Sequence, residues 1–323
     1  MTQPNCEPLQ YPSADKNHII AGYLYTLPGA APRAVIQISH GMCEYIGRYR
    51  HLIDFFTAQG FAVAGNDHLG HGASAPPEDR GHFADKNGYR CILADLKTMN
   101  DKLHQRFPGL PVVLYGHSMG SFFARWYAEL WPDTIDALIL SGTAGPSPRN
   151  RLGLALARVT AAVAGQRYHS ALIIRAQTGS YCRRIPDAVS HNAWISRDPA
   201  VVAAYDADPG CQFNFTAAAY RDMLTALTHV SSRKWAASLP KDLPVLLVAG
   251  TDDPVGDYGS GVREVYARLG DAGMQDLTCQ IYEGGRHEMH NEINRNELFA
   301  DELAWLDSRL FGGQGRPQDR PEE

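Results

Sequence analysis

Residues 112–126, VVLYGHSMGSFFARW, place a serine between two glycines where a strand pattern changes into a helix pattern. A serine on so tight a strand-to-helix turn adopts a strained backbone. Only glycine leaves room where the strand and the helix cross. The turn lifts the hydroxyl clear of the sheet, at the positive end of the new helix. This stretch therefore predicts a nucleophile, Ser118, at the edge of a sheet, provided that the rest of the chain supplies its partners.

Strand and helix patterns alternate on both sides of this turn. Continuous apolar runs, typical of strands buried on both faces, are followed by amphipathic segments such as RYRHLIDFFTAQG and ELFADELAWLDSRLF. A hairpin strand, NHIIAGYLYTLP, precedes them. Strands that alternate with helices predict an α/β fold, with a mostly parallel central sheet and helices on both faces. The apolar runs are RAVIQISHG, FAVAGND, PVVLYGHS, DALILSG and PVLLVAG.

The alternation breaks over residues 145–235, where we expect an inserted helical cap above the carboxyl ends of the strands. This segment contains LGLALARVTAAVAG, which predicts a helix, and it holds eleven basic residues against five acidic ones. Residues 1–144 and 236–311 are predicted to form the core. Residues 312–323 have the composition of a disordered tail, with the sequence GGQGRPQDRPEE.

The overall composition narrows the class of protein and its partners. A formal net charge of -5 and a pI near 6.2 give no reason to expect nucleic-acid binding. The chain shows no secretory signal pattern and no apolar span long enough for a bilayer. Because no export signal is seen, we expect the six scattered cysteines to be reduced thiols rather than disulfides. We expect a cytoplasmic protein, and the sequence does not predict its oligomeric state.

A serine hydroxyl at its ordinary pKa needs a base beside it. On a fold with this turn, an acid and then a histidine each follow a later strand. Asp252, Asp253 and Asp257 come after the strand PVLLVAG, and His287 comes after the strand pattern LTCQIYEGG. His287 is therefore the predicted base for Ser118, and the three aspartates compete to orient it.

The reaction also needs two donors for the oxyanion that forms on the substrate. One backbone N–H follows an early buried strand, and the residue after the nucleophile supplies the other. These are the amides of Met42 and Met119. We expect the two methionine side chains only to pack.

Taken together, these residues give the chain a resemblance to the monoacylglycerol lipase and lysophospholipase group of α/β-hydrolases, from about Leu9 to Phe311. GHSMG is the nucleophile elbow of that group unchanged, and ISRDPAVVAAYDADPGCQF is similar to its cap. Four further stretches resemble the motifs of the group in the same order: HGMCEYIGRY, NDHLGHGAS, GTDDPV and YEGGRHEMHNE.

The resemblance implies an α/β-hydrolase fold and assigns the acid to Asp253 and the base to His287. It also implies that Glu44, Arg48 and His290 contact the glycerol head of the substrate. The alternative for these three is a structural ion pair near the start of a helix and a solvent-facing histidine.

We therefore predict a serine hydrolase that cleaves carboxylic esters through an acyl-enzyme, on a monoacylglycerol or lysolipid substrate. A peptidase, a thioesterase, an acyltransferase and a non-catalytic ligand-binding protein on the same fold are the alternatives. No cofactor or metal is expected. An apolar cap rich in arginine also suggests peripheral contact with membrane lipid, and a solvated basic face is the alternative.

Overall fold

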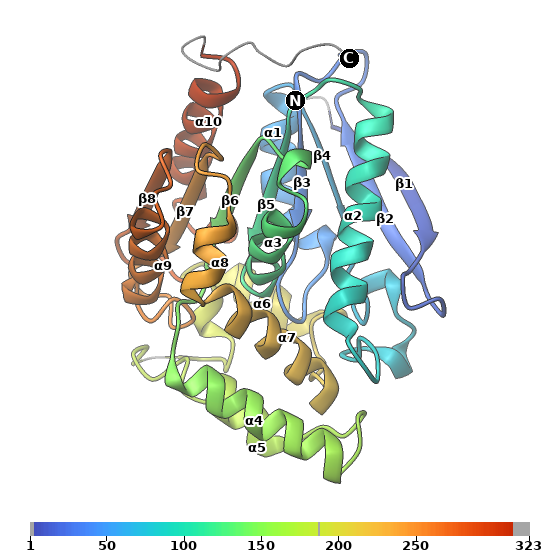
Figure 1. The fold of residues 1–323 in the computed structure, drawn as a ribbon, viewed down its shortest axis with the longest axis vertical. Coiled ribbons are helices and arrows are strands. Elements are labelled where there is room, and N and C mark those ends of the chain that lie inside the picture. The colour runs from blue at the N-terminus through green and yellow to red at the C-terminus, as the bar shows by residue number, and fades with distance from the viewer. Residues whose placement is uncertain (1–2, 187, 313–323) are drawn as a thin grey trace.

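The computed structural model describes residues 3–186 and 188–312, and eight strands in it form one sheet (Figure 1). Their order across the sheet is β1-β2-β4-β3-β5-β6-β7-β8. The β1–β2 hairpin and the β2–β4 pair are antiparallel, and every pair from β4 to β8 is parallel. The predicted mostly parallel sheet is thus confirmed. The strands are β1 (Asn5–Pro12), β2 (Ile19–Thr26), β3 (Ala34–Ser39), β4 (Phe61–Asn66), β5 (Val112–His117), β6 (Ala137–Ser141), β7 (Val245–Gly250) and β8 (Leu277–Tyr282).

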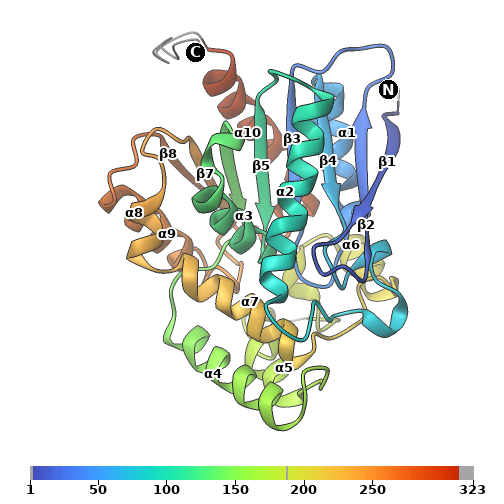
Figure 2. The same ribbon diagram turned by 45° about the vertical axis from the view of Figure 1, so that its right-hand side comes forward.

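Helices cover both faces of the sheet (Figures 1 and 2). Helices α1 (Arg50–Ala58) and α10 (Arg295–Leu310) pack on one face, and α2 (Gly88–Arg106), α3 (Met119–Leu130) and α9 (Ser260–Asp271) pack on the other. Strands β3 to β7 are buried at every residue because both of their faces are covered. This is why their sequences are continuous apolar runs rather than alternating ones.

Between β6 and β7 the described residues form helices and no strand. The helices are α4 (Pro148–Val163), α5 (Ala171–Thr178), α6 (Pro199–Ala207), α7 (Ala217–Val230) and α8 (Arg233–Ser238). Helices α4 to α7 lie across the end of the sheet where the parallel strands finish, and α4 and α5 lie farthest from it (Figure 1). We call residues 145–235 the cap. Its standing as a separate domain remains a prediction, and residues 313–323 of the predicted tail lie outside the described residues.

One buried arginine joins the core to both ends of the cap. The guanidinium of Arg125, on α3, donates to the carbonyl of Ala144 at 3.0 Å and to that of Val230 at 2.5 Å. It lies 4.4 Å from the ring centre of Trp235, whose indole N–H donates back to the Arg125 carbonyl at 2.7 Å. The helix that begins beside Ser118 is therefore tied to the points where the cap begins and ends.

No helix in the described part of the chain is long and apolar enough to cross a membrane.

A buried acid on α10 makes the stability of the fold depend on pH. Glu302 is fully buried, and its carboxyl group lies beside the Tyr115 hydroxyl, which lowers its pKa by less than burial raises it. Burial raises the pKa of Glu302 to about 8, whereas the same group ionises near pH 4.3 in an unfolded chain. Between these values the unfolded chain has lost a proton that the folded chain keeps. The free energy of unfolding therefore falls as the pH rises through this range.

We expect Glu302→Gln to raise the free energy of unfolding, by about 1 kcal/mol at pH 5 and by on the order of 5 kcal/mol at pH 9. Urea unfolding at pH 5, 7 and 9 measures this difference. Glu297→Gln, an exposed position on the same helix, serves as the matched control and should show no such trend. A gain that stays constant with pH would mean that Glu302 does not titrate in this range.

Candidate active site

Ser118 occupies a strained turn between β5 and α3. Its φ of 51° and ψ of −124° are unfavourable for any residue with a side chain. A Cβ atom at Gly120 would overlap the carbonyl oxygen of Ser39, and one at Gly116 would press on the side chain of Ala124. The amide of Ser118 donates to the carbonyl of Ser141 on the next strand at 2.9 Å. The turn is therefore fixed by the sheet and by two positions that only glycine fits.

The loops after three strands bring Ser118, His287 and Asp253 together. Nε2 of His287 lies 2.8 Å from Oγ of Ser118, and Nδ1 lies 3.0 Å from Oδ1 of Asp253. Asp253 is fully buried, whereas Asp252 and Asp257 are exposed. Of the three aspartates that the strand pattern left open, Asp253 is thus the one beside the imidazole.

The surroundings of His287 favour its protonated form. Its burial opposes a positive charge, but the carboxylate of Asp253 outweighs this effect and raises the pKa of His287 above its ordinary value. The rings of His117 and Trp194 lie 4.7 and 4.9 Å from the imidazole, centre to centre, and help to bury it. An imidazole in this setting can accept a proton from Ser118 and hold it as a stabilised cation.

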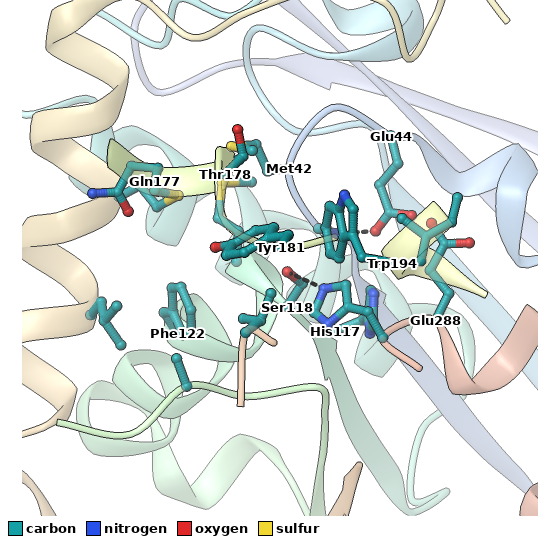
Figure 3. Close-up of a pocket in the computed structure, with 18 of the residues that line it drawn as sticks. Met42, Glu44, His117, Ser118, Phe122, Gln177, Thr178, Tyr181, Trp194 and Glu288 are labelled. Carbon is teal, nitrogen blue, oxygen red and sulfur yellow. Dashed lines mark hydrogen bonds between the residues drawn. The ribbon is translucent and has the colours of Figure 1, made fainter. Parts of the chain in front are cut away.

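A cavity of about 100 Å³ opens above Ser118 (Figure 3). Gly41, Met42, Ser118 and Met119 all line it, so the backbones nominated as oxyanion donors lie at the same cavity as the hydroxyl. Met119 is the first residue of α3, where backbone N–H groups have no partner within the helix. The donor role of the two amides remains a prediction.

The two ends of this cavity differ in chemistry. Figure 3 shows Phe122 on one side of Ser118 and the carboxyl groups of Glu44 and Glu288 on the other. The apolar side continues onto α7 and the loop after β7, and Tyr205 of the cap lines the cavity as well. The further apolar lining residues are Ala144, Met223, Leu224, Leu227 and Val255.

The acidic end rests on a buried polar network. Glu44 accepts from the Gly41 amide and, at 2.7 Å, from the Tyr49 hydroxyl. The guanidinium of Arg48 binds Glu288 at 2.5 Å and lies 3.8 Å from Glu44. Burial and the charge of Glu288 raise the pKa of Glu44, against the opposing effect of Arg48. The network ties the loop that carries Met42 to the loop that carries His287.

Of the three residues expected to contact the substrate head, only Glu44 lines the cavity. His290 is fully buried and stacks on Tyr49, with ring centres 4.4 Å apart. Arg48 does not line the cavity itself, but it contacts Glu44 and Glu288, which do. Direct contact of Arg48 and His290 with a substrate therefore remains a prediction.

The lining residues that were not singled out from the sequence include Tyr181, Trp194, Tyr205 and Glu288. Glu288 directly follows the predicted base. Tyr205 lies within the stretch that resembles the cap of the lipase group, and Trp194 directly precedes that stretch. Their closeness to the predicted base and to the cap motif is the sequence signal by which these residues could have been found. The carbonyls of Trp194 and Ile195 accept from the amides of His287 and Glu288, so the cap also anchors the histidine loop.

Residues 30–294 match a family of hydrolases described as serine aminopeptidase, S33. The chain belongs to the S33 family. This S33-family chain is also 30% identical to a monoacylglycerol lipase of Mycolicibacterium smegmatis over 291 residues, which cover 88% of this chain and 91% of the relative. It is 28% identical to human monoglyceride lipase over 318 residues, with 95% of each chain covered. The resemblance to the monoacylglycerol lipase group is thus confirmed.

Solved structures agree on the fold of the S33-family chain. A thermostable carboxyl esterase from Bacillus coagulans, in complex with glycerol, superposes with a TM-score of 0.89 at 30% identity and covers 94% of this chain and 99% of its own. A soluble variant of the monoglyceride lipase of Saccharomyces cerevisiae has a TM-score of 0.74 at 19% identity, with 96% and 97% covered, and it shows the fold alone. The α/β-hydrolase fold is confirmed, and the chain is a hydrolase of the lipase or esterase type.

Proposed function

We propose that this S33-family chain hydrolyses carboxylic esters through an acyl-enzyme on Ser118. The hydrogen bonds from Ser118 to His287 and from His287 to Asp253 carry this proposal. Oγ of Ser118 attacks the ester carbonyl carbon while Nε2 of His287 takes its proton. The negative charge moves to the carbonyl oxygen, which the amides of Met42 and Met119 stabilise, typically by ~3 kcal/mol for each donor.

The intermediate then collapses and releases an alcohol. The bond between carbon and the leaving oxygen breaks, and His287 gives its proton to that oxygen. A water molecule, deprotonated by His287, attacks the acyl group on Ser118 and frees the carboxylic acid and the serine. Asp253 keeps the proton of the neutral imidazole on Nδ1 throughout, so that Nε2 faces Ser118.

The lining of the cavity supports a substrate with an aliphatic acyl group and an uncharged, hydroxyl-bearing alcohol. Its apolar side between α3 and α7 suits an acyl chain. Its other side offers Glu44 and Glu288 as acceptors for hydroxyl groups. No lysine or arginine stands among the described residues that line it, so a phosphate would find no cation there. These features favour a monoacylglycerol over a lysophospholipid.

The named relatives point in the same direction, since two of them are called a monoacylglycerol lipase and a monoglyceride lipase. In this proposal Glu44 and Glu288 contact the glycerol hydroxyls. Arg48 neutralises and orients both carboxylates, and His290 supports Tyr49, which donates to Glu44. Arg48 and His290 then act as positioning residues.

A hydrolysis panel tests the substrate. We expect kcat/KM for a monoacylglycerol to exceed that for a lysophosphatidate of the same acyl chain by at least about tenfold, since an unpaired phosphate next to two carboxylates costs more than 1.4 kcal/mol. An aminoacyl amide should be cleaved far more slowly than either lipid. Equal kcat/KM values for the two lipids would contradict the preference for an uncharged head group that we infer from Glu44 and Glu288.

Release of N-terminal residues is the second candidate, because the family is described as serine aminopeptidase and because Glu44 and Glu288 could pair with an ammonium group. The aminoacyl amide in the same panel decides between the two. Thioester cleavage and acyl transfer need the same acyl-enzyme and differ only in the leaving group or the acceptor. If the chain hydrolyses none of the substrates in the panel, the non-catalytic ligand-binding alternative is favoured.

A further inference from the structure

The predicted base lies in a loop that is bonded to the cap. We call residues 193–198 the cap strap and residues 283–292 the histidine loop. The amide of His287 donates to the carbonyl of Trp194 at 3.3 Å, and the amide of Glu288 donates to the next carbonyl of the strap at 2.7 Å. Trp194 lines the cavity (Figure 3), and its ring centre lies 4.9 Å from that of His287. The strap therefore contacts both the main chain and the ring of the base.

Glu292 is the point where the strap and the histidine loop meet. Its carboxylate is fully buried and accepts four hydrogen bonds. Oε1 accepts from the amides of Arg197 and Arg286 at 3.0 and 2.9 Å. Oε2 accepts from Nε of Arg197 at 3.0 Å and from the amide of Ile293 at 2.9 Å. Because Arg286 directly precedes His287, one carboxylate fixes both the strap and the residue next to the base.

Arg197 supplies the positive charge that this buried carboxylate needs. Among the described residues, Arg197 is the one that forms an ion pair with Glu292. Its guanidinium also donates to the side-chain oxygen of Asn294 at 2.7 Å, and it lies against Gly284, where a Cβ atom would come within 2.9 Å of it. A buried charge that loses its partner is strongly unfavourable. Without Arg197, Glu292 would therefore have to move toward water and take the histidine loop with it.

The side chain of Arg286 strengthens the contact from the other side. Its guanidinium donates to the strap carbonyls of Ala193 and Ser196 at 2.7 and 2.9 Å. One arginine thus reaches from the loop to the cap, and the other reaches from the cap to the loop. Lifting the strap must either break these bonds or carry His287 away from Ser118, where Nε2 and Oγ lie 2.8 Å apart.

We propose that Arg197 is a positioning residue for the base, because its pairing with Glu292 holds the histidine loop where Nε2 of His287 meets Ser118. The inference rests on the proposed function, since it takes His287 as the base of ester hydrolysis. The cap then belongs to the catalytic framework as well as to the cavity wall. A misplacement of about 1 Å can cost a hundredfold in rate, so breaking the pair should lower kcat. Arg197 does not line the cavity, so KM should change little.

Steady-state kinetics on a soluble short ester test the proposal. We expect Arg197→Ala to lower kcat by about a hundredfold, with KM within about twofold of the wild type. The rate of reaction with a fluorophosphonate should fall by a similar factor, because Ser118 needs the same base. Arg197→Lys keeps the charge but not the planar fork of donors. Its kcat should recover to about fivefold below the wild type, the effect of about one lost hydrogen bond.

Arg167→Ala is the matched control, because it removes another arginine pair between the cap and the core, that with Asp79 at 2.6 Å. It should keep the wild-type kcat. All rates are measured well below the melting temperature of each variant, so that lost stability alone leaves kcat unchanged. An unchanged kcat in folded Arg197→Ala, a raised KM with the wild-type kcat, or an equal loss in the control would overturn the proposal. If Arg197→Ala does not fold, a wild-type kcat in Arg197→Lys would overturn it.

A double-variant cycle tests whether Glu292 is the group through which Arg197 acts. Glu292→Gln removes the charge and keeps an acceptor for the Arg286 amide. The losses in kcat of Arg197→Ala and Glu292→Gln should not multiply in the double variant, because both break the same pair. Losses that multiply would contradict the proposal. A wild-type chain that turns over no ester would refute the proposed function itself, whereas wild-type turnover with an unaffected Arg197→Ala refutes this inference alone.

Discussion

Replacing Ser118 with alanine is expected to lower kcat for ester hydrolysis by about six orders of magnitude, to the level left by binding and the oxyanion donors. The reason is that the acyl-enzyme cannot form without Oγ of Ser118. This oxygen, 2.8 Å from Nε2 of His287, is the nucleophile that the imidazole activates. Initial rates on a p-nitrophenyl ester and on a monoacylglycerol measure the loss. The variant should also fail to react with a fluorophosphonate.

Ser238→Ala is the matched control, since this exposed serine is the last residue of α8, just after the cap, and does not line the cavity. It should keep wild-type rates. Ser118→Ala should melt no lower than the wild type, because the side chain it removes sits on a strained turn and contributes little packing. A folded Ser118→Ala enzyme with more than a few per cent of wild-type activity would contradict the acyl-enzyme.

Replacing Asp253 with asparagine is expected to lower kcat by about four orders of magnitude, as the loss of the orienting carboxylate does in serine-histidine-aspartate triads. The amide can donate to Nδ1 of His287 and so favour the tautomer that turns a proton toward Ser118. Asp252→Asn, at the exposed neighbouring position, is the control and should leave kcat within about twofold, as expected of a surface substitution.

The pH profile separates this role from a merely structural one. Activity requires neutral His287, and Asp253 raises the pKa of that imidazole above its ordinary value of about 6.5. The wild-type kcat/KM should therefore fall when the pH drops below this raised pKa, because His287 is then protonated. Without the carboxylate the cation is less stable, and the acidic limb of the Asp253→Asn profile should move to lower pH. A limb that stays in place would show that Asp253 does not set the protonation of His287.

Much of the fold could be predicted from the sequence because its signals are local. A strand buried on both faces needs mostly apolar residues, and β3 to β7 have them. Gln37 of β3 is a buried polar exception, and its side-chain amide donates to the Leu96 carbonyl. The predicted LGLALARVTAAVAG helix in fact begins earlier, at Pro148, because Ser147 caps it by accepting from the amide of Arg149. The short helix α8 gave no periodic signal, since its six residues span less than two turns.

The candidate site was predictable only where a residue follows a strand. Ser118, Asp253 and His287 obey that rule, and the structure brings them within hydrogen-bonding distance. Glu288 and Trp194 reach the cavity because the cap and the histidine loop bond to each other. Such contacts between distant segments leave no periodicity or spacing in the sequence. The same is true of the Arg125 contacts with both ends of the cap.

Mapping the covalent adduct tests the central claim most directly. The wild-type chain is treated with a fluorophosphonate, digested, and its modified peptide is sequenced by mass spectrometry. We predict one adduct per chain, on Ser118, formed more slowly at low pH as His287 becomes protonated. An adduct on another serine, such as the neighbouring Ser121, or ester turnover by a chain that takes no adduct at all, would contradict the mechanism.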